Sequence, residues 1–228
     1  STHTPVIHAY QSSPRNTHVK YTDTSDYKFI LGTNLLAYNN FRPWPNWNVN
    51  IFNYRPYKGA ILAGVGSAPN SKKINTYTKY LYRNTLSHKY IHSTRDERTK
   101  ILLESIGLRA INTGCVTLWG LTKEKCQQIP SAKSGRVVFT LTDYAQDKDK
   151  DRQLINTLKR NYSDVYFWPQ GSDDYEYIHE LEVDGIKIIA PQLEAYRELL
   201  KSGDIDFVGT RLHAGIFAMQ NNVRSLIL

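Results

Sequence analysis

Two side chains that could bind an anion and transfer a proton stand near the end of the chain, at Arg211 and His213. Apolar residues at 205–208 predict a short strand before them, and the apolar spacing after them predicts a helix. A helix start offers unpaired N–H groups, and arginine adds a planar fork of donors that fits a carboxylate or phosphate. We therefore expect an anion site that includes Thr210 and Leu212, with His213 as its general acid or base.

The expected local structure is a tight turn at Gly209 and Thr210 that also caps the helix. The apolar spacing predicts that the buried face of this helix holds Leu212, Ile216, Phe217 and Met219. The alternative is that Arg211 is a surface charge and that His213 is a structural side chain.

A second arginine, Arg95, lies in a similar place, between a predicted strand at 90–93 and a helix that opens at 94 and stops at Gly107. Two such arginines could hold the two acidic ends of one ligand. The alternative for Arg95 is an ion pair with Asp96 or Glu97.

Other strand ends supply candidate binding residues. Asn34 follows a strand predicted at 27–31, Gly64 and Gly66 follow one at 60–63, and Gln170 follows one at 165–168. The Gly64–Gly66 segment lacks the third glycine of a dinucleotide fingerprint, so it either lets the backbone approach a ligand or only turns the chain.

Strands and helices alternate along the chain, most regularly from residue 136 onward. Strands are predicted at 108–111, 137–141 and 186–189, and helices at 74–86, 94–106, 147–161, 172–181 and 192–200. Such alternation with short connections is typical of a parallel sheet covered by helices on both faces. Ligands bind at the carboxyl ends of such strands, so Gln170, Thr210, Arg211 and His213 are expected on one rim. We place the halves at residues 1–130 and 131–228.

Composition narrows the class of partner. The 228 residues carry a formal net charge of +8, which favours acidic partners. The basic residues are scattered, so no nucleic-acid tail is expected. No stretch is apolar enough to span a membrane, and any membrane association would be peripheral. No metal-ligand spacing is found. Cys115 and Cys126 are expected to be free, reduced thiols, and Cys115 is expected to be a packing residue, not a nucleophile.

Sixteen tyrosines and four tryptophans are a further feature of the composition. Sugars stack on such rings, although most of them are expected to be half-buried packing residues.

Taken together, these motifs resemble the polysaccharide pyruvyl transferase family. The matching blocks are 30–36, 64–66, 92–97, 112–121, 140–144, 168–171 and 206–216, the last of which holds the Arg-Leu-His sequence at Arg211 to His213.

The resemblance implies two Rossmann-like halves that face a cleft, similar to the glycosyltransferase-B arrangement. It implies phosphoenolpyruvate as the donor, a glycan or lipid-linked sugar as the acceptor, and no cofactor. Arg95 and Arg211 would meet the acidic groups of the donor. A cytoplasmic protein that works at the inner face of the membrane is expected. Family members usually begin with an additional strand and continue past residue 228, so a chain trimmed at both ends is expected.

Two alternatives remain at this stage. One is a nucleotide-sugar glycosyltransferase of the same architecture. The other is a non-catalytic module that binds a glycan or a phosphate.

Overall fold

The computed structural model describes residues 25–41, 46–68 and 73–228. The chain divides into two compact units, Ser1–Val116 and Thr117–Leu228. This boundary lies before the short helix α4 (Lys123–Gln127), whereas the sequence places the boundary after it, between residues 130 and 131.

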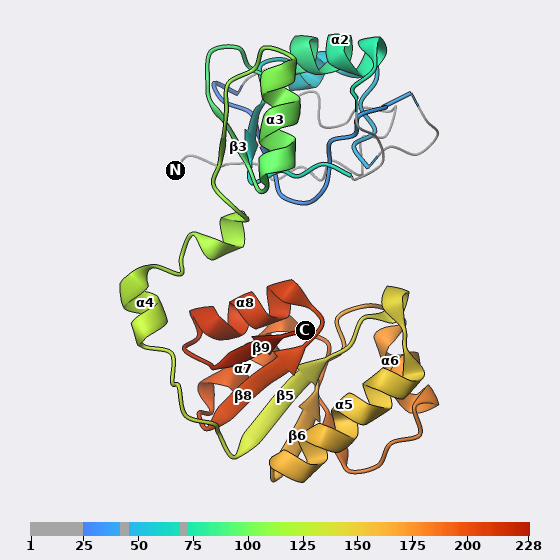
Figure 1. The fold of residues 1–228 in the computed structure, drawn as a ribbon, viewed down its shortest axis with the longest axis vertical. Helices are drawn as coiled ribbons and strands as arrows, with labels where there is room; N and C mark the ends of the chain where they lie inside the picture. The colour runs from blue at the N-terminus through green and yellow to red at the C-terminus, as the bar shows by residue number, and fades with distance from the viewer. Residues whose placement is uncertain (1–24, 42–45, 69–72) are drawn as a thin grey trace. The chain divides into compact units, whose positions relative to one another are not determined.

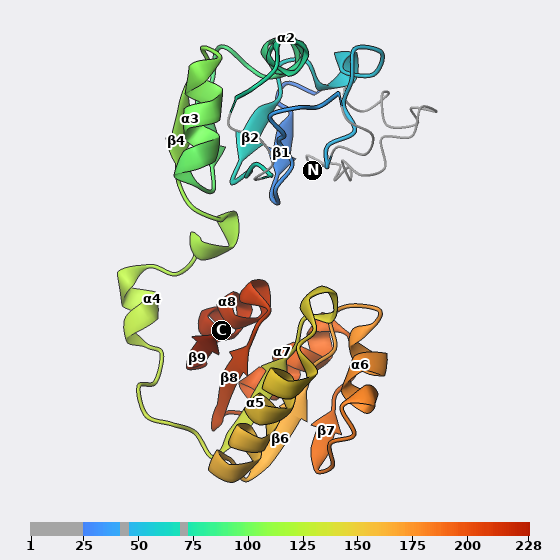
Figure 2. The ribbon, with the colours of Figure 1, turned by 45° about the vertical axis from the view of Figure 1, so that its right-hand side comes forward.

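The second unit is built on a five-stranded parallel sheet with the order β7-β6-β5-β8-β9 (Figures 1 and 2). Its strands are β5 (Arg136–Thr140), β6 (Asp164–Phe167), β7 (Ile186–Ile188), β8 (Ile205–Gly209) and β9 (Ser225–Ile227). Its connecting helices are α5 (Lys148–Asn161), α6 (Asp174–Glu180), α7 (Leu193–Lys201) and α8 (Leu212–Gln220). The strand order reverses between β5 and β8, and at such a switch point the connections leave toward opposite faces of the sheet.

Helices lie on both faces of this sheet (Figure 2), and each face has its own hydrophobic core. Side chains alternate along a strand, so Val137 and Phe139 of β5 pack with α5 and α6, while Val138 packs with α7 and α8. The sheet is therefore covered by helices on both faces, as the alternating pattern predicts.

Helix α8 lies closer to the sheet than its sequence pattern suggests. Leu212, which we predicted to be buried, is 50% exposed, and the fully buried positions include Ala214, Gly215 and Ala218. A Cβ at Gly215 would lie only 2.6 Å from Ile227 Cγ1. Small residues face the sheet because they permit this close approach, so the prediction for Leu212 was wrong.

The first unit is also α/β, with parallel strands β1 (Phe29–Leu31), β2 (Ile61–Ala63), β3 (His92–Thr94) and β4 (Ala110–Asn112). Strand β1 pairs with β2 and β3 pairs with β4, and a bridge between Val65 and Thr94 links the two pairs. Helices α2 (Thr76–Thr85) and α3 (Glu97–Ser105) contribute to a single core.

Side-chain caps define where these two helices begin. Asn75 accepts from Thr78 N at the start of α2, and Asp96 accepts from Thr99 N at the start of α3. Asp96 is thus occupied as a helix cap directly beside Arg95.

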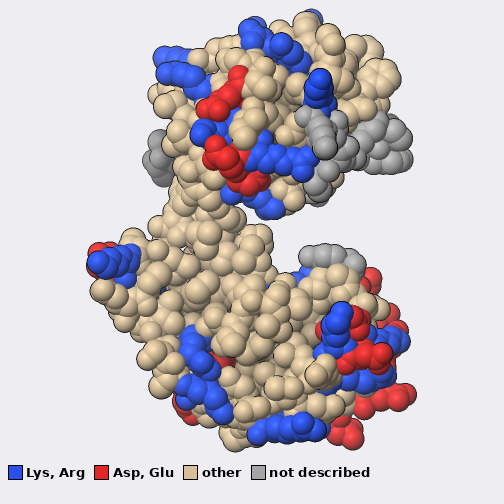
Figure 3. Space-filling view, viewed as in Figure 1, with Lys and Arg blue, Asp and Glu red and all other residues tan. Residues whose placement is uncertain are grey.

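Two further properties concern partners. No helix in the described ranges is both long and apolar enough to cross a membrane. Lys and Arg side chains form several separate groups on the face drawn in Figure 3, some of them interleaved with acidic residues.

Candidate functional site

The predicted anion site in the second unit begins where β8 ends. Strand β8 is buried throughout, and Arg211 is the residue that precedes α8, with φ −89° and ψ 99°. No side chain caps this helix start. The helix cap is therefore Arg211, not Thr210 as expected. His213 is the second residue of α8 and is exposed at the rim formed by the carboxyl ends of the strands.

The guanidinium of Arg211 is held from several sides. Its Nε donates to the carbonyl oxygen of Leu141 at 2.8 Å. Its Nη2 lies 3.0 Å from Asp143 Oδ1 and 2.5 Å from Asp174 Oδ1. The Arg211 side chain is only 16% exposed, and Asp174 is fully buried. We call these three side chains the Arg211 network.

The Arg211 network joins the loops that follow three strands. Asp174 Oδ2 accepts from the backbone N–H of Gln170 at 2.8 Å and of Gly171 at 2.7 Å. One carboxylate thus fixes the loop after β6 and, through Arg211, the start of α8. The loop of Gln170, Arg211 and His213 therefore lie at the same rim of the sheet, as predicted. The side chain of Gln170 is exposed there.

Two glycines make room for this network and its surroundings. A Cβ at Gly171 would lie 2.8 Å from Arg211 Nη2 and closer still to Asp143. A Cβ at Gly209 would lie 2.7 Å from the carbonyl oxygen of Thr140. Both distances are shorter than an ordinary contact. A side chain at Gly209 would collide with backbone atoms, whereas a side chain at Gly171 would displace the ends of the Asp143 and Arg211 side chains.

Hydroxyl groups cluster at the switch point between β5 and β8. The Oγ1 atoms of Thr142 and Thr210 lie 2.6 Å apart. Thr140 Oγ1 is buried and has no hydrogen-bond partner among the described residues. Thr210 therefore uses its hydroxyl to join the two strand ends, which explains why it does not cap α8.

The predicted site residues of the first unit also lie together. A Cβ at Gly66 would lie 2.6 Å from Arg95 Nε and even closer to Asn34 Oδ1, so all three meet around this glycine. Arg95 N donates to the carbonyl oxygen of Val65 at 3.1 Å. Gly64 has a positive φ of 62°, and its N–H donates to Ser93 Oγ at 2.9 Å. This is a second polar site at the carboxyl ends of parallel strands.

The two arginines that were paired in our sequence hypothesis, Arg95 and Arg211, belong to different units. In the described part of the chain, no group of three or more His, Cys, Asp or Glu side chains has the arrangement of a metal site. Cys126 is exposed and Cys115 is partly buried.

Sequence reasoning missed the acidic members of the Arg211 network. Asp143 lies in one of the motif blocks but received no role, and Asp174 was not singled out. The available signal was that Asp174 follows the strand-ending Gln170–Gly171 turn at the start of a predicted helix. A carboxylate at that place often accepts backbone N–H groups.

This arrangement is suited to anion recognition and proton transfer. The N–H groups at the start of α8 and the positive end of its dipole favour a negative charge, and His213 lies within the same turn. The Arg211 network fixes the backbone that carries these N–H groups and His213.

Comparison with known proteins gives one family. The family model described as polysaccharide pyruvyl transferase matches residues 2–228, which is nearly the whole chain. No curated protein and no solved structure gives a significant match.

Proposed function

We propose that this chain, which belongs to the polysaccharide pyruvyl transferase family, moves the enolpyruvyl group of phosphoenolpyruvate onto a sugar as a pyruvate ketal. The family indicates pyruvyl transfer to a polysaccharide in general. The observation that carries the proposal is the match over residues 2–228, because it includes both the Arg95 and the Arg211 sites. The rim with Arg211 and His213 supports it.

The reaction needs a proton on the methylene carbon of phosphoenolpyruvate, so that positive charge develops at the neighbouring carbon, which bears the oxygen of the phosphate ester. A sugar hydroxyl then attacks this carbon and gives up its proton. The second hydroxyl then attacks the same carbon, phosphate leaves and takes the proton of this hydroxyl, and the ketal closes. We assign proton transfer to His213, since the ordinary pKa of histidine lies nearest neutral pH.

In this proposal Arg95 and Arg211 recognise the carboxylate and the phosphate of the donor across a cleft between two Rossmann-like halves. The N–H groups at the start of α8, near Thr210 and Leu212, would assist. Arg211 already forms hydrogen bonds with Asp143 and Asp174. The carboxylate or phosphate of phosphoenolpyruvate would therefore have to compete with these two side chains for Arg211.

The N-terminal residues have a corresponding role in the proposal. Asn34, Gly64 and Gly66 would contact the donor or the acceptor beside Arg95. Gln170 would do so at the rim of the second unit. The acceptor would be a glycan or its lipid-linked precursor, met at the cytoplasmic face of the membrane. Phosphoenolpyruvate carries the activated group itself, so the proposal includes no cofactor, metal or nucleic acid.

The test is to incubate the protein with phosphoenolpyruvate and candidate glycans, and to measure phosphate release and ketal formation. We expect His213→Ala to lower turnover by about 100-fold or more, as is typical when a general acid is lost. His179→Ala is a matched control, because His179 is an exposed histidine on α6 of the same unit. Normal turnover by His213→Ala would remove its proton-transfer role.

A further inference from the structure

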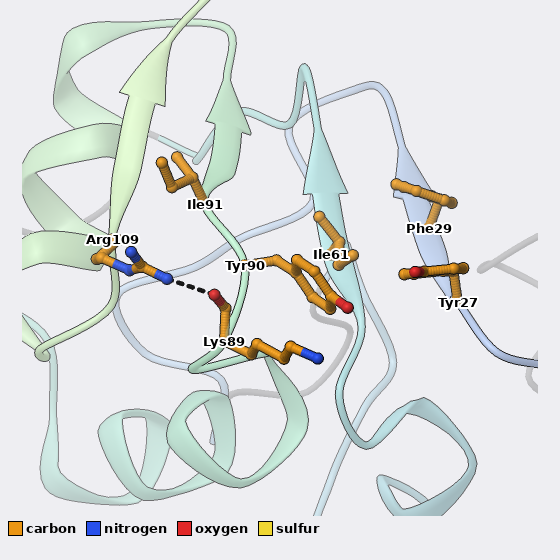
Figure 4. Close-up of a pocket in the computed structure, with 7 residues that line it drawn as sticks. All are labelled: Tyr27, Phe29, Ile61, Lys89, Tyr90, Ile91 and Arg109. Atoms are coloured by element: carbon orange, nitrogen blue, oxygen red, sulfur yellow. Dashed lines mark hydrogen bonds between the residues drawn. The ribbon is translucent and has the colours of Figure 1, made fainter.

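A hollow of about 470 Å³ lies at the amino ends of the strands in the first unit (Figure 4). We call it the amino-end hollow. Its lining consists of Tyr27, Phe29, Ile61, Lys89, Tyr90, Ile91 and Arg109. Phe29 and Ile61 are the first residues of β1 and β2, whereas Asn34, Gly66 and Arg95 follow the carboxyl ends of strands. The hollow is therefore separate from the proposed donor site of the same unit.

Aromatic side chains give the amino-end hollow flat, accessible walls. Tyr27 is 57% exposed and Phe29 is 61% exposed. The rings of Tyr27 and Phe29 are stacked with centroids 6.4 Å apart, and the Tyr27 and Tyr90 rings lie 5.7 Å apart at 60°. Exposed tyrosine rings offer both an apolar face and a hydroxyl group, which together suit the CH faces and hydroxyls of a sugar.

Cations border these rings. Lys89 Nζ lies 5.2 Å from the centroid of the Tyr90 ring, and the Arg109 guanidinium donates to the carbonyl oxygen of Lys89. Among the residues that the structure describes, no acidic side chain lines the hollow, and Asp26 is the acidic neighbour of Tyr27. Two cations beside aromatic faces favour a ligand that carries a negative charge.

We propose that the amino-end hollow binds a carboxylate-bearing sugar of a polysaccharide chain. Tyr27, Phe29 and Tyr90 would stack on the sugar ring, while Lys89 and Arg109 would meet its carboxylate. The inference rests on the proposed function, because a pyruvate ketal itself adds a carboxylate to the polymer. The hollow would then bind a part of the polysaccharide that is distant from the sugar that reacts. The volume of the hollow falls within the usual range for ligand sites.

The test is a calorimetric titration of the full chain with three oligosaccharides of equal length: a hexuronate oligomer, a pyruvylated oligosaccharide and a neutral one. We expect both acidic probes to bind more tightly than the neutral probe. The first two probes also distinguish between uronate and ketal as the source of the carboxylate. Equal affinity for all three probes would overturn the proposed charge recognition.

Variants locate the binding. Tyr27→Ala should weaken binding of the acidic probes by roughly fivefold, the effect of losing one aromatic contact. Tyr80→Ala is the matched control, since Tyr80 is 55% exposed on α2 outside the hollow. Lys89→Gln should reduce the preference for acidic probes, whereas Lys79→Gln, a change at an exposed lysine on α2, should not. Unchanged affinity in Tyr27→Ala and Lys89→Gln would refute the site.

Activity measurements separate this inference from the proposed function. Tyr27→Ala should release phosphate from phosphoenolpyruvate at the wild-type rate with a short acceptor and bind acidic polymer more weakly. Phosphate release by the wild type without binding at the hollow would refute the hollow alone. Binding at the hollow without phosphate release from any acceptor would refute the pyruvyl transfer alone.

Discussion

At the scale of single residues, Arg211 is the side chain whose surroundings differ most from its expected role. It was expected to meet a ligand from a helix start, and the structure places Asp143, Asp174 and the Leu141 carbonyl oxygen against its guanidinium. Two carboxylates beside one guanidinium give a formal charge of −1 if both are ionised. An anion bound here, as we propose, would therefore have to be recognised by the α8 backbone and His213 as well as by Arg211.

Asp174 is expected to be the residue of this network on which stability depends most. Asp174→Ala would leave Arg211 without its fully buried partner and the N–H groups of Gln170 and Gly171 without their acceptor. We expect the free energy of unfolding to fall by about 3 kcal/mol, measured by urea denaturation. Asp173→Ala is the control: Asp173 is exposed and makes no side-chain cap, so its loss should cost less than about 0.5 kcal/mol. Equal stability of the two variants would contradict this account.

At the scale of elements, the contact between α8 and the sheet depends on one glycine. A Cβ at Gly215 would lie 2.6 Å from Ile227 Cγ1 and 2.9 Å from Phe207 Cε1. Gly215→Ala should therefore push α8 from the sheet and lower the unfolding free energy by about 1 to 3 kcal/mol. Gly120→Ala is the matched control, since its nearest atom would be Gln220 Nε2 at 3.9 Å. Thermal melting of both variants measures the difference, and a fully stable Gly215→Ala would show that the helix can adjust.

Strand β8 is joined to Arg224, the residue before β9, by an ion pair that makes stability depend on pH. Asp206 is fully buried and lies 2.5 Å from Arg224 Nη2, and the hydroxyl of Tyr162 donates to it at 2.8 Å. Burial by itself raises the pKa of Asp206. The hydrogen bonds from Arg224 and Tyr162 outweigh this effect and hold the pKa below its ordinary value.

The sign of the pH effect follows from this lowered pKa. In acid the unfolded chain takes up a proton at Asp206 before the folded chain does. The contribution of Asp206 is therefore complete above the ordinary aspartate pKa of about 3.9 and is lost as the pH falls through the lowered value. Urea unfolding between about pH 6 and pH 3 should show a steeper loss of stability in the wild type than in Asp206→Asn. Asp184→Asn, at an exposed position, should retain the wild-type slope.

At the scale of the whole molecule, each unit has its own hydrophobic packing. The boundary between the units depends on which of them the segment 117–130 belongs to. Gln220 Nε2 at the end of α8 donates to the carbonyl oxygen of Thr117 at 2.6 Å, within the second unit. A fragment of residues 117–228 retains this bond, whereas a fragment of residues 131–228 does not.

We expect both fragments to fold, because both contain the five-stranded sheet and its two cores. The longer fragment should be more stable by about 1 kcal/mol, the usual contribution of one hydrogen bond. Urea unfolding of the two purified fragments measures this. Equal stability would favour the boundary between residues 130 and 131 that the sequence suggests.

The local pattern of apolar residues predicted most helices and strands of the second unit. It also predicted the rim at which the loops after the strands meet. Strand and helix periodicity located β5, α5 and β6 nearly to the residue, because each has an apolar side that must be buried. The same reasoning failed for Leu212. Which side of a helix packs against a sheet depends on the space available, and here Gly215 and Ala214 provide that space.

The sequence by itself determined the α/β class, the family and the clustering of Arg211 and His213 at a helix start, because these follow from local periodicity and contiguous motifs. Only the tertiary structure decided what surrounds Arg211. Asp143 and Asp174 lie 68 and 37 positions away in the sequence, and no local pattern relates them to Arg211. They meet because the carboxyl ends of β5, β6 and β8 are neighbours in a parallel sheet, where one guanidinium can pair with carboxylates from separate loops.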